Sequence, residues 1–456
     1  MPKRPNIVFL FSDQQRYDTV SGYGAVPGAP LGLTPNLDAL AADGVRFDLA
    51  MTCQPVCGPA RACLQTGLYP DAIGCTVNDR ALPPDVTTVA DRMNAAGYET
   101  AYVGKWHLAS QNSFASPPAP DTADYKTKPI PPERRGGYRD YWMAADVLEF
   151  TSHGYGGYVY DGDGRRVDFD GYRADFLADR AIVYIRKPKE KPFFLFVSWL
   201  EPHHQNDRGR CEAPDGWAER YADYEVPADL SGTGGDWREE MPAYLACCRS
   251  LDENVGRILD ALGETGQLDD TLVVYASDHG CHFRTRNGEY KRSCHDASLH
   301  VPLIVRGPGF RGGRTVNRLT SLIDLPPTLL DAAGIAVPDS FPGHSLAPLA
   351  ADPESSVRDE VLVQISEAGR GRAIRTPEQT FCAMLDPADG DPDLYREAYC
   401  YDNRIDPAQR NNLAGDPAFR AEREALRVRL AETVLREEGR RIRILEKQNP
   451  DPKFRS

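Results

Sequence analysis

The sequence predicts an α/β protein, an α/β/α sandwich in which helices cover both faces of a large, mostly parallel sheet. Apolar runs rich in β-branched and aromatic residues alternate along the chain with segments of helical periodicity. Most of these runs are almost continuously apolar, as expected of strands that are buried on both faces. The length of 456 residues favours two structural units over one core. We expect the first over 1–356 and the second over 357–456.

The elements follow from local patterns. The expected strands of the large sheet are 6–11, 100–103, 193–198, 271–277 and 302–305. Thr34-Pro35 predicts the start of a helix over 36–43, because threonine often caps helices and proline fits the first helical position. Apolar spacing predicts helices over 88–96 and 243–262, each followed by glycine. The second unit is expected to be a small α+β domain with a short antiparallel sheet and a helix, at 361–365, 373–375, 381–385, 398–401 and 417–438.

Composition argues against several kinds of partner. The net charge of −14 argues against nucleic acid and against an anionic membrane, since both require a basic protein surface. The apolar run at 7–11 is too short for a signal peptide or a membrane span, so we expect a cytoplasmic protein. The 11 cysteines lack regular spacing, and we expect most to be free buried thiols. The oligomeric state stays open, with a homo-oligomer as one alternative.

Polar residues follow four of the predicted strands. They are Asp13 and Gln14, Lys105 and His107, His203, and Asp278 and His279. Ligands of open α/β sheets bind outside the carboxyl ends of the strands, so these residues predict one shared site. Asp13, Gln14, Asp278 and His279 offer carboxylate, amide and imidazole groups, which suit a divalent cation. The alternatives are helix N-caps at both aspartates and a buried, hydrogen-bonded imidazole at His279.

Cys57 begins a short helix that is expected over 57–65. Free N–H groups and the positive end of the dipole at a helix start favour an oxyanion there. Arg61 lies one turn later and can offer planar donors to the same anion. As an unmodified thiol, Cys57 would be only an activated nucleophile.

The segment Cys57-Gly58-Pro59-Ala60-Arg61, continuing to Pro70, resembles the signature of the type I, formylglycine-dependent sulfatases of the alkaline phosphatase-like superfamily. Motifs at 104–108, 201–204, 288–292 and 300–304 also resemble that family, over about residues 5 to 335. The resemblance implies hydrolysis of a sulfate ester, either a small aryl sulfate or a saccharide sulfate. It also implies that a maturation enzyme oxidises Cys57 to Cα-formylglycine. One hydroxyl of the hydrated aldehyde would attack sulfur, and the other would expel the sulfate.

The resemblance also implies roles for further residues. Lys105 and Lys291 would hold sulfate oxygens, His203 would protonate the leaving oxygen, and His107 would take the proton of the second hydroxyl. The alternatives are solvated lysines and a core-facing His107. Further candidates for substrate contact are Asn78, Arg80, His204, Glu367 and Arg372. A turn at Asn78 and a solvated hairpin tip at Glu367 and Arg372 are the alternatives there.

Two positions depart from the sulfatase pattern. Many sulfatases have two consecutive aspartates where this chain has Asp13-Gln14, and Asp-Asn where it has Asp278-His279. The resemblance keeps Ca²⁺ first, with Mn²⁺, which an imidazole favours, and Mg²⁺ as alternatives. The same substitutions occur in phosphonate monoester hydrolases and phosphodiesterases, which form the alternative function. A non-catalytic binding protein is the third hypothesis, and it requires Cys57 to remain a thiol.

Overall fold

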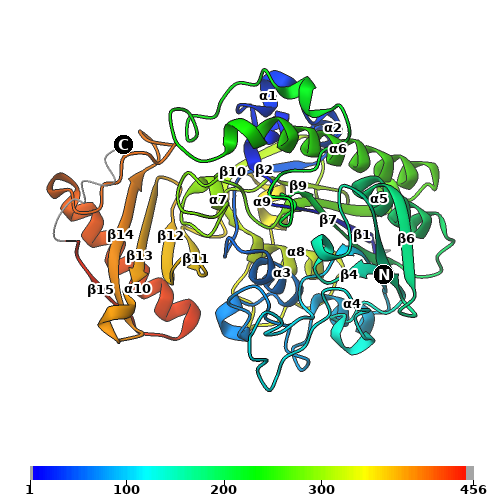
Figure 1. The fold of residues 1–456 in the computed structure, drawn as a ribbon, viewed down its shortest axis with the longest axis horizontal. Coiled ribbons are helices and arrows are strands. Elements are labelled where there is room, and N and C mark those ends of the chain that lie inside the picture. The colour runs from blue at the N-terminus through cyan, green and yellow to red at the C-terminus, as the bar shows by residue number, and fades with distance from the viewer. Residues whose placement is uncertain (1–3, 448–456) are drawn as a thin grey trace.

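The computed structural model describes residues 4–447 and folds them around two β-sheets (Figure 1). The large sheet has ten strands in the order β10-β2-β9-β8-β1-β7-β3-β4-β5-β6, and the small sheet has five in the order β11-β12-β13-β14-β15. The strands of the large sheet are β1 Asn6–Asp13, β2 Val45–Met51, β3 Glu99–Lys105, β4 Tyr141–Ala145, β5 Tyr155–Asp161, β6 Arg166–Tyr172, β7 Phe193–Pro202, β8 Thr271–Ser277, β9 Leu303–Arg306 and β10 Arg314–Ser321.

The middle of the large sheet is parallel. β1 pairs in parallel with β7 and β8, and β3 pairs in parallel with β7 and β4. β9 runs antiparallel to β8 and β2, and β5 runs antiparallel to β4 and β6, so the sheet as a whole is mixed. All five predicted strands are present. β7 continues beyond its predicted end because Trp199 and Leu200 are also fully buried.

Helices cover both faces of this sheet. The helices are α1 Gly28–Leu31, α2 Pro35–Asp43, α3 Cys57–Thr66, α4 Val89–Ala95, α5 Arg173–Arg186, α6 Trp237–Glu264, α7 Asp296–Leu299, α8 Leu325–Ala332, α9 Ala347–Ala351 and α10 Arg420–Glu438. Alternate residues of β1 point to opposite faces. Ile7 and Phe9 join an apolar cluster with α3, α4 and α8, whereas Val8 and Leu10 join a cluster with α2, α5 and α6. In Figure 1, α3 and α4 lie below the sheet and α2 and α6 above it.

The helix starts differ in part from the prediction. Thr34 precedes α2, but its hydroxyl accepts a hydrogen bond from Ser21 N at 2.8 Å instead of capping the helix. Thr88 does cap α4, through a capping box. α6 begins before its predicted start and contains Pro242. That proline forfeits one backbone hydrogen bond, which the buried apolar face of a 28-residue helix tolerates.

The five-stranded sheet and α10 lie beside the large sheet, at the left of Figure 1. The strands are β11 Val361–Ile365, β12 Gly371–Arg375, β13 Gln379–Leu385, β14 Leu394–Asp402 and β15 Arg443–Leu445. β11 to β14 pair in antiparallel fashion, as predicted, and β15 adds in parallel to β14. α10 begins later than predicted because Pro417–Phe419 form a 3₁₀ turn.

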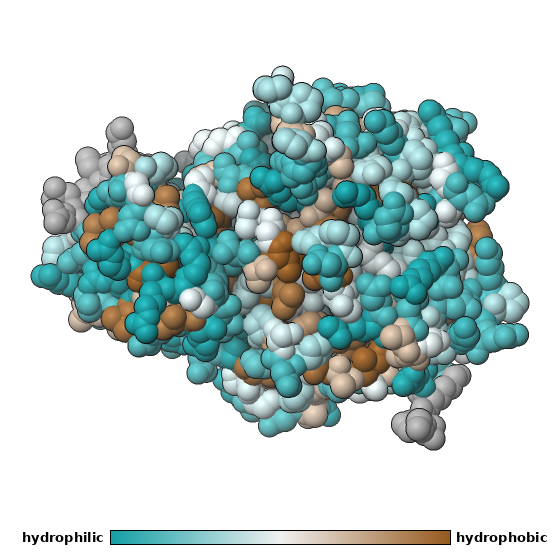
Figure 2. Space-filling model, turned by 90° about the horizontal axis from the view of Figure 1, so that it is seen from below, coloured by the Kyte–Doolittle hydropathy of each residue, from teal (hydrophilic) through white to brown (hydrophobic). Residues whose placement is uncertain are grey.

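The cysteines and the polarity of the surface are the next features of the fold. Each of the 11 cysteines is a free, buried thiol, as predicted. No helix in the described part of the chain has the length and apolar character needed to cross a membrane. The face shown in Figure 2 is mostly hydrophilic, with small apolar groups near its centre.

Candidate active site

Four chain segments meet at the carboxyl edge of the parallel strands. Asp13 ends β1 and Lys105 ends β3, while Asp278 and His279 follow β8 and His203 follows β7. All five side chains are buried. Lys105 Nζ lies 2.8 Å from Asp13 Oδ2, and His279 Nε2 lies 3.5 Å from Asp278 Oδ2. The structure thus brings together residues that are far apart in the sequence.

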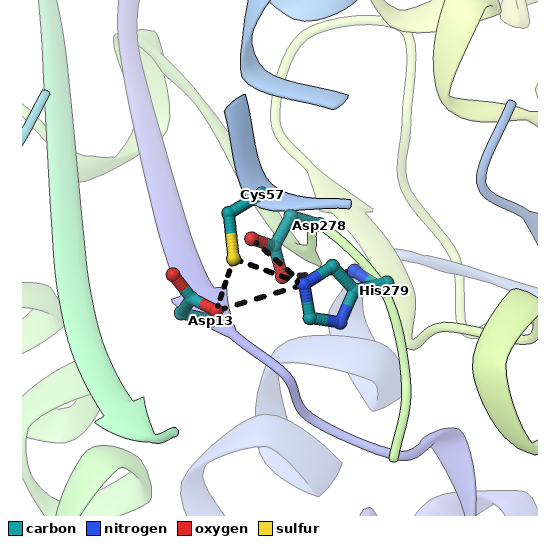
Figure 3. Close-up of side chains that lie close together, drawn as sticks. All are labelled: Asp13, Cys57, Asp278 and His279. Carbon is teal, nitrogen blue, oxygen red and sulfur yellow. Dashed lines mark hydrogen bonds and ion pairs between the residues drawn. The ribbon is translucent and has the colours of Figure 1, made fainter. Parts of the chain in front are cut away.

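Cys57 opens α3 and points into this cluster (Figure 3). Its sulfur lies 2.9 Å from Lys291 Nζ, 3.2 Å from His279 Nε2 and 3.4 Å from Asp13 Oδ1. Burial and Asp13 act to raise the pKa of the thiol, but the surrounding cations outweigh them and lower the pKa to about 7. The electrostatic environment of position 57 therefore favours negative charge.

The pKa values of the two aspartates of the cluster are shifted in opposite directions. Arg61 and Lys105 lie 3.0 and 2.8 Å from Asp13 Oδ2. Burial acts to raise the pKa of Asp13, but Lys105 and the neighbouring cations hold it well below its usual range. Burial and then Asp13 raise the pKa of Asp278 to about 7. Asp278 Oδ2 has no hydrogen-bond partner among the described residues, so an additional cation would stabilise its ionised form.

These groups fit one divalent cation. One ligand atom from each of Asp13, Cys57, Asp278 and His279 lies within 4.8 Å of the others. His279 Nδ1 donates to Gly280 O at 2.9 Å, so Nε2 is the ring nitrogen that faces the cluster and could bind a metal ion. The carboxylates of Asp13 and Asp278 supply oxygen ligands and the negative charge that such an ion requires.

Gln14 lies beside the cluster in a left-handed conformation, with φ 69°. Its N–H donates to Asp278 Oδ1 at 2.9 Å, and its Oε1 accepts from Lys291 Nζ at 3.3 Å. Strained backbone tends to concentrate at functional sites. Within residues 4–447, five of the nine non-glycine residues with positive φ lie at this site. These five are Gln14, Asp79, His107, Arg292 and Glu367.

A cavity of about 360 Å³ opens over Cys57, and His107, His203 and Lys291 line it. Burial and Lys105 lower the pKa of His107 to about 4, and its buried Nδ1 has no partner in the described part of the chain. His203 Nδ1 donates to the backbone carbonyl of the next residue at 2.6 Å. Burial and Lys291 hold the pKa of His203 well below its usual range. Both imidazoles are therefore neutral here, and a bound anion would favour their protonation.

Asn78 and Glu367 link opposite sides of the cavity rim. Asn78 Oδ1 accepts from Gly58 N at 2.9 Å, which satisfies a free N–H in the first turn of α3. The N–H of Asn78 donates to Glu367 Oε1 at 2.5 Å, and Arg292 lies 2.6 Å from Glu367 Oε2. Glu367, from the loop between β11 and β12, therefore ties the small sheet to the cavity.

Arg80 and Arg372 lie outside this cavity, contrary to expectation. Arg372 belongs to β12 and not to the loop before it. Its side chain is 3% exposed and lies 2.6 Å from Glu438. The alternative prediction, that Arg372 lies at a solvated hairpin tip, is therefore also wrong. The partner belongs to the end of α10, which no local pattern near Arg372 indicates.

Several residues of the site were not predicted. Glu149 accepts from Lys105 Nζ at 2.9 Å, and Phe114, Phe150 and Arg292 line the cavity. Three of these lie in the segment 111–171, whose long connections do not reveal their fold from sequence. Glu149 could have been found by the rule that site residues follow the carboxyl ends of parallel strands, because it follows β4, the strand beside β3.

Comparisons with known proteins agree with this arrangement. The Sulfatase family model matches residues 5–335, and the model "N-sulphoglucosamine sulphohydrolase, C-terminal" matches 288–436. An ulvan-active sulfatase from Formosa agariphila is 33% identical and covers 92% of this chain and 78% of its own. An N-acetylglucosamine-6-O-sulfatase from Bacteroides thetaiotaomicron is 27% identical, covering 94% and 86%. The solved structure of a putative sulfatase, yidJ, from Bacteroides fragilis has a TM-score of 0.80 at 25% identity, covering 95% and 96%.

The fold and the site define an α/β protein in which a buried group of side chains that could hold a metal ion lies at the carboxyl edge of the parallel strands. The chain belongs to the sulfatase family. This membership confirms the resemblance found in the sequence, and it places the protein among the sulfuric ester hydrolases of the alkaline phosphatase-like superfamily.

Proposed function

We propose that the protein hydrolyses a carbohydrate or aryl sulfate ester at Cys57, after a maturation enzyme has oxidised that residue to formylglycine. The supporting observation is the Cys57 sulfur at the start of α3, 2.9 Å from Lys291 Nζ and 3.2 Å from His279 Nε2. This sulfur stands where formylglycine would carry its two hydroxyls, one to attack sulfur and one to expel the sulfate. The names of the two relatives refer to ulvan and to N-acetylglucosamine, which supports a carbohydrate substrate.

A divalent cation completes the proposed site. Asp13, Asp278, His279 and position 57 would hold it, because their ligand atoms converge there. Gln14, whose Oε1 lies 3.3 Å from Lys291 Nζ beside this cluster, would be a further ligand. Once bound, such an ion would polarise the nucleophile and a sulfate oxygen. We propose Ca²⁺, since oxygen ligands dominate the set, with Mn²⁺ as the alternative that the imidazole favours and Mg²⁺ as a third.

The protein's own residues divide the remaining tasks. Lys291 Nζ, already at the nucleophile position, would hold a sulfate oxygen. Arg61 and Lys105 keep Asp13 ionised and in place, and Lys105 would add positive charge near the sulfate. In His203, Nδ1 is already engaged, so Nε2 would carry the proton to the leaving oxygen.

His107 would serve the second half of the reaction. Its buried Nδ1 has no hydrogen-bond partner among the described residues and would take the proton from the hydroxyl that expels the sulfate. Asn78, His204 and Glu367 line the cavity and are the proposed contacts to the alcohol part. Glu367 would be the contribution of a second unit, 357–456, to a site otherwise built by 1–356.

A phosphonate monoester or phosphodiester hydrolase is the second candidate. The observation that favours it is the ligand set, in which Gln14 and His279 replace the charged or amide residues of many sulfatases. Lys105 and His107 favour sulfate ester hydrolysis over phosphonate or phosphodiester hydrolysis, because the latter enzymes tend to lack these two residues.

The proposal is tested with protein that is co-produced with a formylglycine-generating enzyme. Mass spectrometry of the peptide containing residue 57 should show conversion, and Cys57→Ala should abolish sulfate release. Cys400→Ala, which removes another buried thiol on β14, is the matched control and should retain turnover. Sulfate release by Cys57→Ala at the wild-type rate would overturn the proposal.

A further inference from the structure

The outer part of the cavity carries two exposed phenylalanines. Phe114 is 65% exposed and Phe150 is 46% exposed, and their ring centroids lie 6.1 Å apart. No other phenylalanine of residues 4–447 is as exposed to solvent, and both line the cavity over Cys57. Paired apolar rings left in water beside a reacting group indicate a surface that a ligand covers.

Phe114 is held in place by the surrounding protein. Asp79, which has φ 61°, accepts hydrogen bonds from Ser113 Oγ at 2.6 Å and from Phe114 N at 3.2 Å. Lys126 Nζ lies 3.9 Å from the centroid of the Phe114 ring and donates to Ser113 O at 3.1 Å. A ring held by these contacts presents its surface without the cost of ordering it on binding.

Charge at the cavity mouth is mainly negative. Arg292 is shared between Glu289, at 3.1 Å, and Glu367, at 2.6 Å. Asp79 adds a third carboxylate to the lining. Lys126 near Phe114 is paired with Asp124 at 3.6 Å, so it does not reverse the balance. A second anionic group on the substrate would meet these carboxylates at short range and be repelled.

The cavity also limits the size of the alcohol part. A volume of about 360 Å³ is at the lower end of small-molecule sites, and the sulfate itself must occupy the end at Cys57. The remaining space suits one ring next to the ester, and a longer molecule would have to project into solvent.

We propose that the alcohol part of the substrate is a single uncharged ring, whose face packs against Phe114 and Phe150, and that the carboxylate mouth rejects a second sulfate. This inference rests on the proposed sulfate ester hydrolysis. An aryl ring and a pyranose ring both have the required apolar face with a sulfate at the edge. The experiment below distinguishes an aryl substrate from a pyranose substrate.

The test compares kcat/KM for phenyl sulfate, a pyranose 6-sulfate and methyl sulfate, which has no ring. Phe114→Ala and Phe150→Ala should lower the value for a ring substrate about tenfold and leave methyl sulfate unchanged. Ile405→Ala, which removes another exposed apolar side chain, is the control and should change none of the values. If these variants lose more kcat/KM for phenyl sulfate than for the pyranose 6-sulfate, the site binds an aryl ring. The reverse result identifies a pyranose ring.

Charge is tested with the same pyranose carrying a second sulfate. Wild type should turn this disulfate over about tenfold more slowly than the monosulfate, and Glu289→Gln should narrow that gap. Equal losses on ring and ringless esters in the phenylalanine variants, or a preference for the disulfate, would overturn the inference while sulfate hydrolysis itself stands. Release of sulfate from none of these esters by formylglycine-containing wild type would overturn the proposed function as well.

Discussion

Replacing Lys105 by methionine should separate a structural role of this lysine from a catalytic one. The ammonium group lies 2.8 Å from Asp13 Oδ2 and 2.9 Å from Glu149 Oε1, and its side chain is 0% exposed. Asp13 keeps Arg61 as a partner, whereas Glu149 is left buried beside an apolar chain. Breaking a buried ion pair in this way costs about 3–5 kcal/mol of unfolding free energy. Turnover should fall about 10²–10³-fold, as for the loss of one group that stabilises the transition state.

A second substitution then restores the charge balance. In Lys105→Met/Glu149→Gln no uncompensated carboxylate remains at position 149, so about 1–3 kcal/mol of the lost stability should return. Activity should not return, because the positive charge near the sulfate is still absent. Urea unfolding measures the first quantity and kcat/KM the second. Strictly additive stability losses, or sulfate release by the double variant near the wild-type rate, would refute the reasoning.

Three further changes test other parts of the site. Gly104→Ala should prevent stable folding, because φ is +105° and a Cβ would lie 1.9 Å from Ser198 O in the neighbouring strand. Gly263→Ala, in α6, meets no atom within 4 Å and should keep or slightly raise the melting temperature. Arg372→Ala should lower unfolding free energy by about 3–5 kcal/mol by leaving Glu438 unpaired, with kcat/KM retained, and a loss of kcat/KM at wild-type stability would contradict its position outside the cavity. Chelation should abolish turnover and lower the melting temperature, and Ca²⁺ should restore both; recovery with Mn²⁺ alone would reassign the cation.

Much of the fold was visible in the sequence because it rests on local patterns. The runs at 6–11 and 271–277 are buried on both faces, and such strands are almost uniformly apolar. The start of α6 was missed, since Pro242 is a poor helix residue in isolation and only tertiary burial compensates for it. β15 has three residues and depends on pairing with β14, which no local pattern reveals.

The candidate site was predictable where its residues end buried strands or belong to a compact motif. Asp13, Lys105 and Asp278 follow apolar runs, and their convergence follows from parallel pairing. Glu149 and Phe114 come from long connections, whose course depends on contacts between distant segments. Arg372 was misplaced because its partner Glu438 lies 66 residues further along the chain.

The central claim is that this site cleaves sulfate esters through a converted Cys57. The most direct measurement is the ratio of kcat/KM for an aryl sulfate to that for the matched aryl phosphonate monoester, with formylglycine-containing enzyme and Cys57→Ala as the blank. We expect a ratio well above one, with no turnover of either ester by Cys57→Ala. A ratio below one would contradict the claim and make Gln14 and His279 the better guide to a phosphonate hydrolase.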